Sequence, residues 1–161
     1  MAQTSLDIPL NLSELKKDVL SRKISGTTCP CCGRYVKLYK RKLTSSMVQA
    51  LILIYKYFKL NPESWLHVEN YLKQQNISAA IRGDFPKLRY WGLLEKQIDK
   101  REDGSGRVGY YKVSQKGIDF INGRIEVPRF VFIYNQTVER FSEEKTGIKK
   151  ALGDKFSFDE I

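Results

Sequence analysis

The chain has 161 residues, of which 42% are hydrophobic and 12% aromatic, and its 28 Lys and Arg against 18 Asp and Glu give a net charge of +10. This size allows one good core with small extensions, and the hydrophobic fraction argues against global disorder. No stretch approaches the roughly 18 consecutive apolar residues that a membrane-spanning helix needs. A secretory signal pattern is also missing at the N-terminus, so we expect a cytoplasmic protein without membrane contact.

The positive charge is concentrated near the N-terminus, where residues 1–60 hold eleven Lys and Arg against three Asp and Glu. An excess of this size suits a polyanionic partner such as nucleic acid. A basic pI, here about 9.5, can equally serve only to keep a small protein in solution. Composition alone gives these two explanations equal weight.

Residues 1–43 predict an N-terminal extension that combines a helix, a cysteine turn and a basic strand. Residues 1–11 are typical of an arm, and Ser13 can cap a helix that runs to about Lys23 with apolar residues at helical spacing. The sequence CPCCGR follows. The next segment, RYVKLYKRKL, alternates apolar and polar residues as a half-buried strand does.

The cysteine turn is a candidate zinc site. Cys29 and Cys32 form a C-x-x-C pair, and the proline and glycine of CPCCG favour a tight turn that aims both sulfurs at one point, as in half of a zinc ribbon. The candidates for further ligands are Cys31, whose side chain should point elsewhere, and His67, the only histidine, or the cysteines of a second copy in a homodimer. A metal-free turn of buried thiols is the alternative, because a single C-x-x-C pair is a weak signal. No cofactor other than zinc is indicated.

The strand after this turn is strongly basic, with five cations in nine residues, no acid, and two tyrosines among them. The cations are Arg34, Lys37, Lys40, Arg41 and Lys42, and the tyrosines are Tyr35 and Tyr39. Cations can follow phosphates while aromatic rings stack on bases, single strands included. An edge strand that lysines protect against aggregation is the alternative explanation. We expect phosphate contacts from the last four of these cations.

Residues 44–124 predict a unit of helices and a hairpin. A residue within 44–46 can cap a helix with a broad apolar face that ends by Asn61, and Ser64 can cap a second helix that ends near Gln75. The segment ISAAIRG is ambiguous between helix and loop.

A short helix, a β-hairpin and a further helix complete this unit. Asp84 can cap the short helix with Pro86 in its first turn, and Gly92 can close it in the left-handed conformation. Three apolar residues at a spacing of three would face inward, namely Phe85, Leu88 and Trp91. The runs LLEKQ and VGYYKV around a polar, glycine-containing tip predict a hairpin with a long loop, and Ser114 can cap the helical start QKGIDFI.

This order of elements predicts a winged helix-turn-helix core whose short helix enters the major groove of duplex DNA. The expected DNA contacts are Arg82, Lys87, Arg89 and Tyr90 on and near that helix, and Lys100, Arg101 and Arg107 at the wing tip. Wing contacts would mainly position the protein on the phosphate backbone. Ordinary solvated charges explain any one of these residues equally well, and Glu102 and Asp103 dilute the positive field of the wing.

The same residues carry a resemblance to a known family. LRYWGLLEKQ followed by GYYKVSQKGIDFI resembles the recognition-helix end, wing and following helix of MarR-like and PadR-like winged-helix regulators, over about the middle half of the chain. The whole chain, including CPCCGRYVKLYKRKL and the ending ALGDKFSFDEI, is similar to a group of small phage and prophage proteins. The resemblance implies DNA binding in a bacterial cytoplasm. The long terminal dimerisation helices of MarR-like regulators are missing, which leaves a homodimer of that kind open.

Residues 125–161 predict a C-terminal hairpin and helix packed on the core. The sequence VPRFVFIYNQTVERFS is typical of two strands around Asn135 and Gln136, and EEKTGIKKALG of a helix closed by Gly153. An acidic and aromatic tail follows. We expect no catalysis, because the chain has one histidine and no phosphate loop, nucleophile elbow or cluster of carboxylates.

The sequence thus predicts an α+β, mainly helical fold, with a winged helix-turn-helix core at 44–124, an N-terminal cysteine-knuckle and β extension, and a C-terminal β-hairpin plus helix. We expect a DNA-binding transcriptional regulator or accessory factor. One alternative is a protein-interaction module whose aromatic strand, Phe130, Phe132 and Tyr134, extends a partner's sheet or forms a homodimer interface. Another is a zinc-stabilised binder of RNA or single strands.

Overall fold

The computed structural model describes residues 11–98, 102–104 and 109–153. Within these residues lie six α-helices, one 3-10 helix and ten short strands, so the protein is α+β, as predicted. The strands form four small antiparallel sheets, and the expectation of a mainly helical chain therefore overstates the helices. In this part of the chain, no helix combines the length and the apolar character that crossing a membrane requires.

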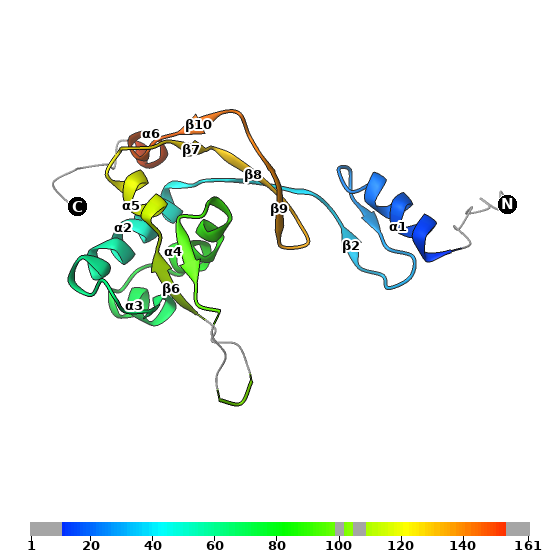
Figure 1. The fold of residues 1–161 in the computed structure, drawn as a ribbon. Helices are drawn as coiled ribbons and strands as arrows, with labels where there is room; N and C mark the ends of the chain where they lie inside the picture. Colours follow the sequence, from blue (N-terminus) through cyan, green and yellow to red (C-terminus); the bar gives the residue numbers. More distant parts are fainter. Residues whose placement is uncertain (1–10, 99–101, 105–108, 154–161) are drawn as a thin grey trace.

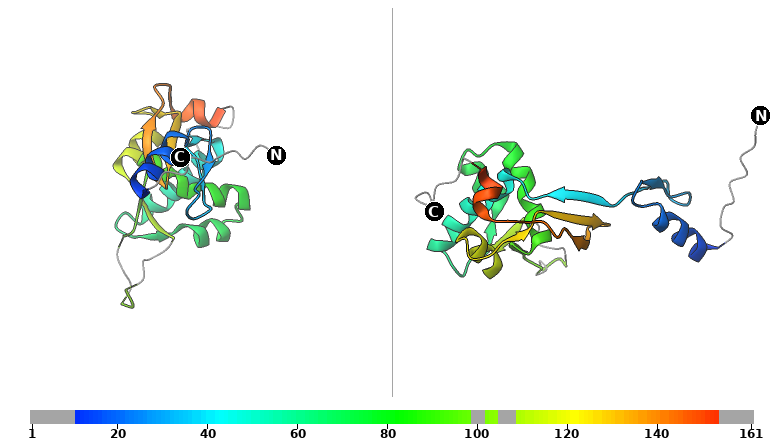
Figure 2. Two further views of the ribbon diagram at one scale, coloured as in Figure 1. Left: turned by 90° about the vertical axis from the view of Figure 1, so that its right-hand side faces the viewer. Right: turned by 90° about the horizontal axis from the view of Figure 1, so that it is seen from above.

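The molecule is elongated, with a small N-terminal unit at one end and a helical core at the other (Figure 1). The view from above in Figure 2 shows the same separation. The elements of the N-terminal unit are α1 (Leu12–Ser21), β1 (Thr27–Thr28) and β2 (Tyr35–Val36). Asn11 caps α1, since its side chain accepts a hydrogen bond from the backbone N–H of Glu14 at 2.9 Å, and the expected cap at Ser13 is wrong by two residues.

The basic segment after the cysteine turn is broken into two strands rather than forming one. β2 pairs with β1, whereas β3 (Tyr39–Lys42) pairs with β8 (Phe130–Tyr134), which also pairs with β9 (Thr137–Phe141). Between β2 and β3 the N–H of Leu38 donates to the carbonyl of Lys23 at 2.8 Å. This bond turns the chain out of the first sheet and into the second.

The hairpin of β8 and β9 forms as predicted, with Asn135 and Gln136 at φ values of 48° and 62° in its two-residue turn. β8 is the middle strand of its sheet, so both of its edges are already hydrogen-bonded. A partner strand could therefore be added to this sheet only beside β3 or β9. An ion pair between Lys23 and Glu139 ties the hairpin to the N-terminal unit.

α2 (Ser45–Leu60) is the central helix of the core, as predicted. Thr44 caps it by accepting a hydrogen bond from the N–H of Met47 at 3.3 Å. Its inner face is fully buried at Val48, Leu51 and Ile54. Burial of this kind contributes roughly 1.5–3 kcal/mol for each large side chain, so α2 anchors the elements around it.

The next helix begins later than expected. Leu66 and His67 form β4 (Leu66–His67), which pairs with β6, and α3 (Val68–Gln74) follows. The cap is the imidazole of His67, whose Nδ1 accepts from the N–H of Asn70 at 3.3 Å, and the expected cap at Ser64 is wrong. Because Leu66 and His67 pair with β6, the first turn of the expected helix is extended instead.

The ambiguous ISAAIRG segment contributes to α4 (Ala79–Asp84), which runs directly into the 3-10 helix η1 (Phe85–Trp91). Asp84 is the last residue of α4 and also holds the N-cap position of η1, with Pro86 in the first turn, as predicted, but its side chain makes no capping hydrogen bond within the described residues. Gly92 closes η1 at φ 71°, as predicted. The inward residues are confirmed as Phe85, Leu88 and Trp91. Their spacing of three matches the three residues per turn of a 3-10 helix.

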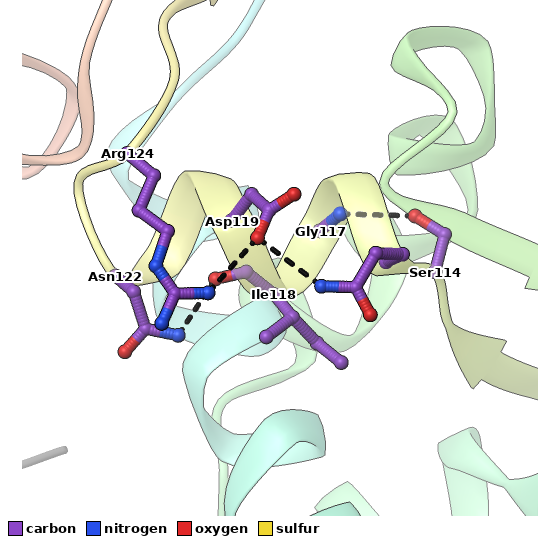
Figure 3. A network of polar contacts seen from close by, with 7 residues as sticks. Ser114, Gly117, Ile118, Asp119, Asn122 and Arg124 are labelled. Atoms are coloured by element: carbon purple, nitrogen blue, oxygen red, sulfur yellow. Dashed lines mark hydrogen bonds and ion pairs between the residues drawn. The ribbon is translucent and has the colours of Figure 1, made fainter.

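The predicted hairpin is confirmed as β5 (Leu94–Lys96) and β6 (Tyr110–Val113), in a sheet of order β4-β6-β5, and α5 (Gln115–Ile121) follows. Ser114 fastens the base of the hairpin, because its hydroxyl donates to the carbonyl of Gly92 at 2.6 Å. The same hydroxyl accepts from the N–H of Gly117 at 2.9 Å, a bond that Figure 3 shows. A Cβ on Gly117 would lie 2.3 Å from the carbonyl oxygen of Leu93. Only glycine therefore fits this close approach without a shift of the backbone.

The C-terminal elements pack on the core through two further short strands and a helix. They are β7 (Val127–Pro128), β10 (Lys145–Thr146) and α6 (Ile148–Leu152). The predicted C-terminal helix starts only at Ile148, because Lys145 and Thr146 pair with β7. The indole N–H of Trp91 donates to the carbonyl of Pro128 at 2.7 Å, which links η1 to this region. The acidic tail from residue 154 lies outside the described residues.

Candidate nucleic-acid interface

β3 presents its side chains on two different faces of the β3–β8–β9 sheet. The register pairs Tyr39 with Ile133, Lys40 with Phe132, Arg41 with Val131 and Lys42 with Phe130. Residues opposite one another in an antiparallel pair lie on the same face. Arg41 therefore shares a face with the buried side chains of Val131 and Ile133, which we call the groove face. Lys40 and Lys42 share the other face with Phe132 and Phe130, which we call the outer face.

A groove of about 920 Å³ runs along the groove face, between the N-terminal unit and η1. Its lining comes from five segments of the chain. They are Leu12, Leu15, Lys16, Val19 and Leu20; Cys29, Cys31, Cys32, Arg34, Tyr35, Val36 and Lys37; Tyr39 and Arg41; Lys87 and Tyr90; and Ile133, Tyr134, Asn135 and Gln136. The groove thus joins two predicted sets, the basic strand and the short helix, that are separated by more than forty residues in the sequence.

The charge of this lining is of one sign. Among the described residues it includes the cations Lys16, Arg34, Lys37, Arg41 and Lys87, and no Asp or Glu. One of the five is partly neutralised, because Lys87 Nζ lies 2.7 Å from Asp84 Oδ1 just outside the groove. Field lines from cations along a concave surface reinforce one another, so the groove favours a polyanion.

Four tyrosines line the same groove, namely Tyr35, Tyr39, Tyr90 and Tyr134. The guanidinium of Arg41 lies 5.2 Å from the ring centre of Tyr39, and that of Arg89 lies 5.0 Å from the ring centre of Tyr90. Tyr35 and Tyr39 are 59% and 43% exposed, which leaves their rings available to a ligand. Flat rings beside cations can stack on bases or sugars.

The outer face is arranged differently. Lys40 Nζ lies 4.2 Å from the ring centre of Phe130, and the guanidinium of Arg140 lies 3.7 Å from the ring centre of Phe132. Lys42 lines a separate small cavity of about 230 Å³. The structure thus divides the predicted phosphate contacts, with Lys37 and Arg41 in the groove and Lys40 and Lys42 away from it.

The remaining predicted DNA contacts are spread over three places. Arg82 lies outside the groove, with its Nε 3.5 Å from Glu69 Oε1 of α3. Arg89 donates to the hydroxyl of Tyr90 at 3.3 Å, at the margin of the groove. The wing-tip residues Lys100, Arg101 and Arg107 lie outside the described residues.

The cysteine turn forms the end of the groove. The N–H of Cys29 donates to the carbonyl of Arg34 and the N–H of Gly33 donates to the carbonyl of Cys29, both at 2.8 Å. The backbone N–H groups of Cys32 and then Cys31, with a further contact from the Cys32 thiol, lower the pKa of the Cys29 thiol, while partial burial opposes this. The turn therefore favours a thiolate at Cys29.

The structure does not bring His67 into this cysteine turn. His67 lies in β4 within the core, where its ring packs edge-on against Tyr110 at 5.1 Å. In the described parts of the chain, no group of three or more His, Cys, Asp or Glu is arranged to hold a metal ion.

Some of the groove could not be anticipated from sequence. Lys16 lies on α1 and Tyr134 at the end of β8, and Tyr134 enters the groove because β3 pairs with β8. The alternation predicted for RYVKLYKRKL puts Tyr35, Lys37, Tyr39 and Arg41 on one side, and all four line the groove, although Val36 from the other side lines it too. Comparison of the chain with protein-family models, with curated proteins and with solved structures finds no match.

Proposed function

We propose that this is a non-catalytic DNA-binding protein, a transcriptional regulator or accessory factor, that holds duplex DNA with a winged-helix unit and the basic groove beside it. The order α2, β4, α3, α4 with η1, β5 and β6, with the sheet order β4-β6-β5, supports the winged-helix unit. In such a unit the segment α4–η1 is the recognition helix and the β5–β6 hairpin is the wing.

The observation that carries the proposal is the charge of the groove lining, five cations without an acid, at a surface that includes Lys87 and Tyr90 of η1. Cations that neutralise phosphates release counterions, and each such contact adds about 0.9 to the slope of log affinity against log salt concentration. Contacts of Lys37, Arg41 and Lys87 with phosphates would position the duplex.

The test compares the groove with the outer face of β3. The double variant Lys37→Ala/Arg41→Ala removes two charges from the groove, and Lys40→Ala/Lys42→Ala removes two charges from the outer face. We expect the groove variant to lose about 100-fold in duplex affinity at 0.1 M salt and to lower the salt slope by about 2. The outer-face variant should lose far less, since it changes only the long-range field. Fluorescence anisotropy on one labelled duplex at four salt concentrations measures both.

Equal losses in the two variants would show that net charge, and not the groove, drives the association. No loss in either would reject the proposal. Thermal unfolding of both variants serves as a check, because these exposed cations should contribute little to stability.

A second candidate function is binding of single-stranded nucleic acid, and the four tyrosines of the groove favour it. Stacking of a base on an aromatic ring contributes about 1–3 kcal/mol. Under this second function Tyr39→Ala should weaken binding of a single strand more than that of a duplex, and Tyr39→Phe, which keeps the ring, should restore it. If the wild-type protein prefers the duplex and Tyr39→Ala leaves single-strand binding unchanged, the second function is excluded.

A further inference from the structure

The cysteine turn is built as one half of a metal site. Two backbone hydrogen bonds at 2.8 Å close it, and Gly33 at φ 69° permits its tight geometry. The β1–β2 ladder holds both ends, with Thr28 opposite Tyr35. A C-x-x-C pair in a tight turn that is closed in this way makes a two-ligand clamp for a soft cation such as Zn²⁺.

A structural zinc site needs four ligands, which are usually Cys or His. The 161 residues contain only three cysteines and one histidine. His67 serves elsewhere, since its Nδ1 accepts from Asn70 and its Nε2 faces Gly109, where a Cβ would come within 2.8 Å. It belongs to the core, whereas β2 lies at the far end of the molecule (Figure 1, Figure 2). One copy of these 161 residues therefore offers half of the ligand set.

We propose that two copies of the chain bind one zinc ion between them, with Cys29 and Cys32 of each copy as the four ligands. Cys32 is exposed and Cys29 half-buried, so both can be reached by a second copy. A two-fold axis through the metal supplies an identical pair of sulfurs, and two-fold symmetry is the commonest arrangement of homodimers. Cys31 lies in the same turn but outside the clamp and is not a ligand.

The charges near the cysteine turn favour a dimer joined by a zinc–thiolate centre over a dimer in which two basic chains meet without such a centre. Four thiolates around Zn²⁺ carry a net charge of −2, and cations near a metal–thiolate centre stabilise it. Arg34 and Lys37 follow the turn directly, and Lys16 lines the same end of the groove. The anionic centre thus offsets the repulsion between the cations of the two copies. The dimer would place two grooves in a symmetric pair.

The experiment uses the full chain under a non-thiol reductant, without nucleic acid, so its outcome does not depend on DNA binding. Metal is removed with EDTA and Zn²⁺ is added back, and sedimentation equilibrium and metal analysis report mass and zinc content. We expect a monomer in EDTA and a dimer with one zinc per two chains. Cys29→Ser/Cys32→Ser should stay monomeric and zinc-free, whereas the matched control Cys31→Ser should behave as the wild type.

Titration of the unmodified chain with Co²⁺ avoids reliance on variants that could fail to fold. The visible absorption of tetrahedral tetrathiolate cobalt should saturate at one ion per two chains. Saturation at one ion per chain, a dimer that survives EDTA, zinc on a monomer, no binding at all, or loss of the dimer in Cys31→Ser would each overturn the proposal.

Discussion

The base of the β5–β6 hairpin and the groove face of β3 differ in what their polar groups do. At the hairpin base, Ser114 bonds through its hydroxyl to Gly92 and Gly117 and through its N–H to the carbonyl of Leu93. In the groove, neither Lys37 nor Arg41 forms an ion pair within the described residues. The first region uses its polar groups to build the fold, whereas these two cations of the second take no part in an ion pair that holds the fold.

Because of this difference, residues that resemble a known family can indicate a shared local fold without indicating a shared binding partner. The residues that resemble MarR-like and PadR-like regulators include Gly92, Leu93, Ser114 and Gly117, and all of them are committed to the hairpin base. Such residues report on local architecture. Evidence for a partner must come instead from side chains that the fold does not use, and on this chain those lie in the groove.

The largest expected effect is at the hairpin base. Gly117→Ala places a Cβ 2.3 Å from a backbone oxygen that cannot move without disturbing β5, so we expect the free energy of unfolding to fall by about 3 kcal/mol. Gly83→Ala in α4 is the matched control, because nothing lies within 4 Å of its added Cβ. It should raise stability by up to about 1 kcal/mol. Urea unfolding measures both, and a neutral Gly117→Ala would contradict the close packing.

The second-largest expected effect is a loss of duplex affinity when cations of the short helix η1 are removed, with little change in stability. In the double variant Lys87→Ala/Arg89→Ala, we expect duplex affinity to fall by about 100-fold at 0.1 M salt, since each lost phosphate contact costs about tenfold there. Thermal unfolding should change little. An unchanged affinity would show that η1 is not part of the interface. A melting temperature that falls as far as in Gly117→Ala would show that Lys87 and Arg89 stabilise the fold instead.

A smaller loss is expected when Ser114 is replaced. Ser114→Ala removes both the cap of α5 and the bond to Gly92, which should lower stability by roughly 1–2 kcal/mol. Ser114→Thr keeps the hydroxyl and should retain most of the stability. Nucleic-acid affinity of the folded fraction should be the same in all three proteins, and a selective loss of affinity would place Ser114 in the interface.

The smallest effect is a change in the pH at which one thiol reacts. Backbone donors lower the pKa of Cys29, so alkylation by iodoacetamide in the presence of a chelator should begin at a lower pH at Cys29 than at Cys31. Peptide mass spectrometry resolves the two sites. Identical pH profiles would show that the turn does not favour the thiolate.

The features that could be predicted from sequence are local. The cap of α2 within residues 44–46, the turn at Asn135 and Gln136, the closure at Gly92 and the buried triad of η1 each depend on residues within one or two turns of the chain. Short strands depend instead on partners far away. β1, β4 and β10 were missed because each has two residues and no alternation of its own, and β7 was merged with β8 into one predicted strand.

The candidate site divides in the same way. Its basic strand and its short helix could be recognised separately, because charge runs and helix signals are local. Their meeting in one groove depends on the register between β3 and β8, which no local pattern encodes. The break near Leu38 likewise follows from a bond to Lys23, fifteen residues earlier.

The pairing of Lys42 with Phe130 also bears on how the protein is made. A chain growing on the ribosome exposes the basic strand long before its partner strand exists, so this edge waits unpaired while the helices around α2 collapse. Its lysines and arginines then serve as a temporary safeguard against strand-to-strand aggregation. The same cations that suit a polyanion would in this way keep the nascent chain soluble until β8 arrives.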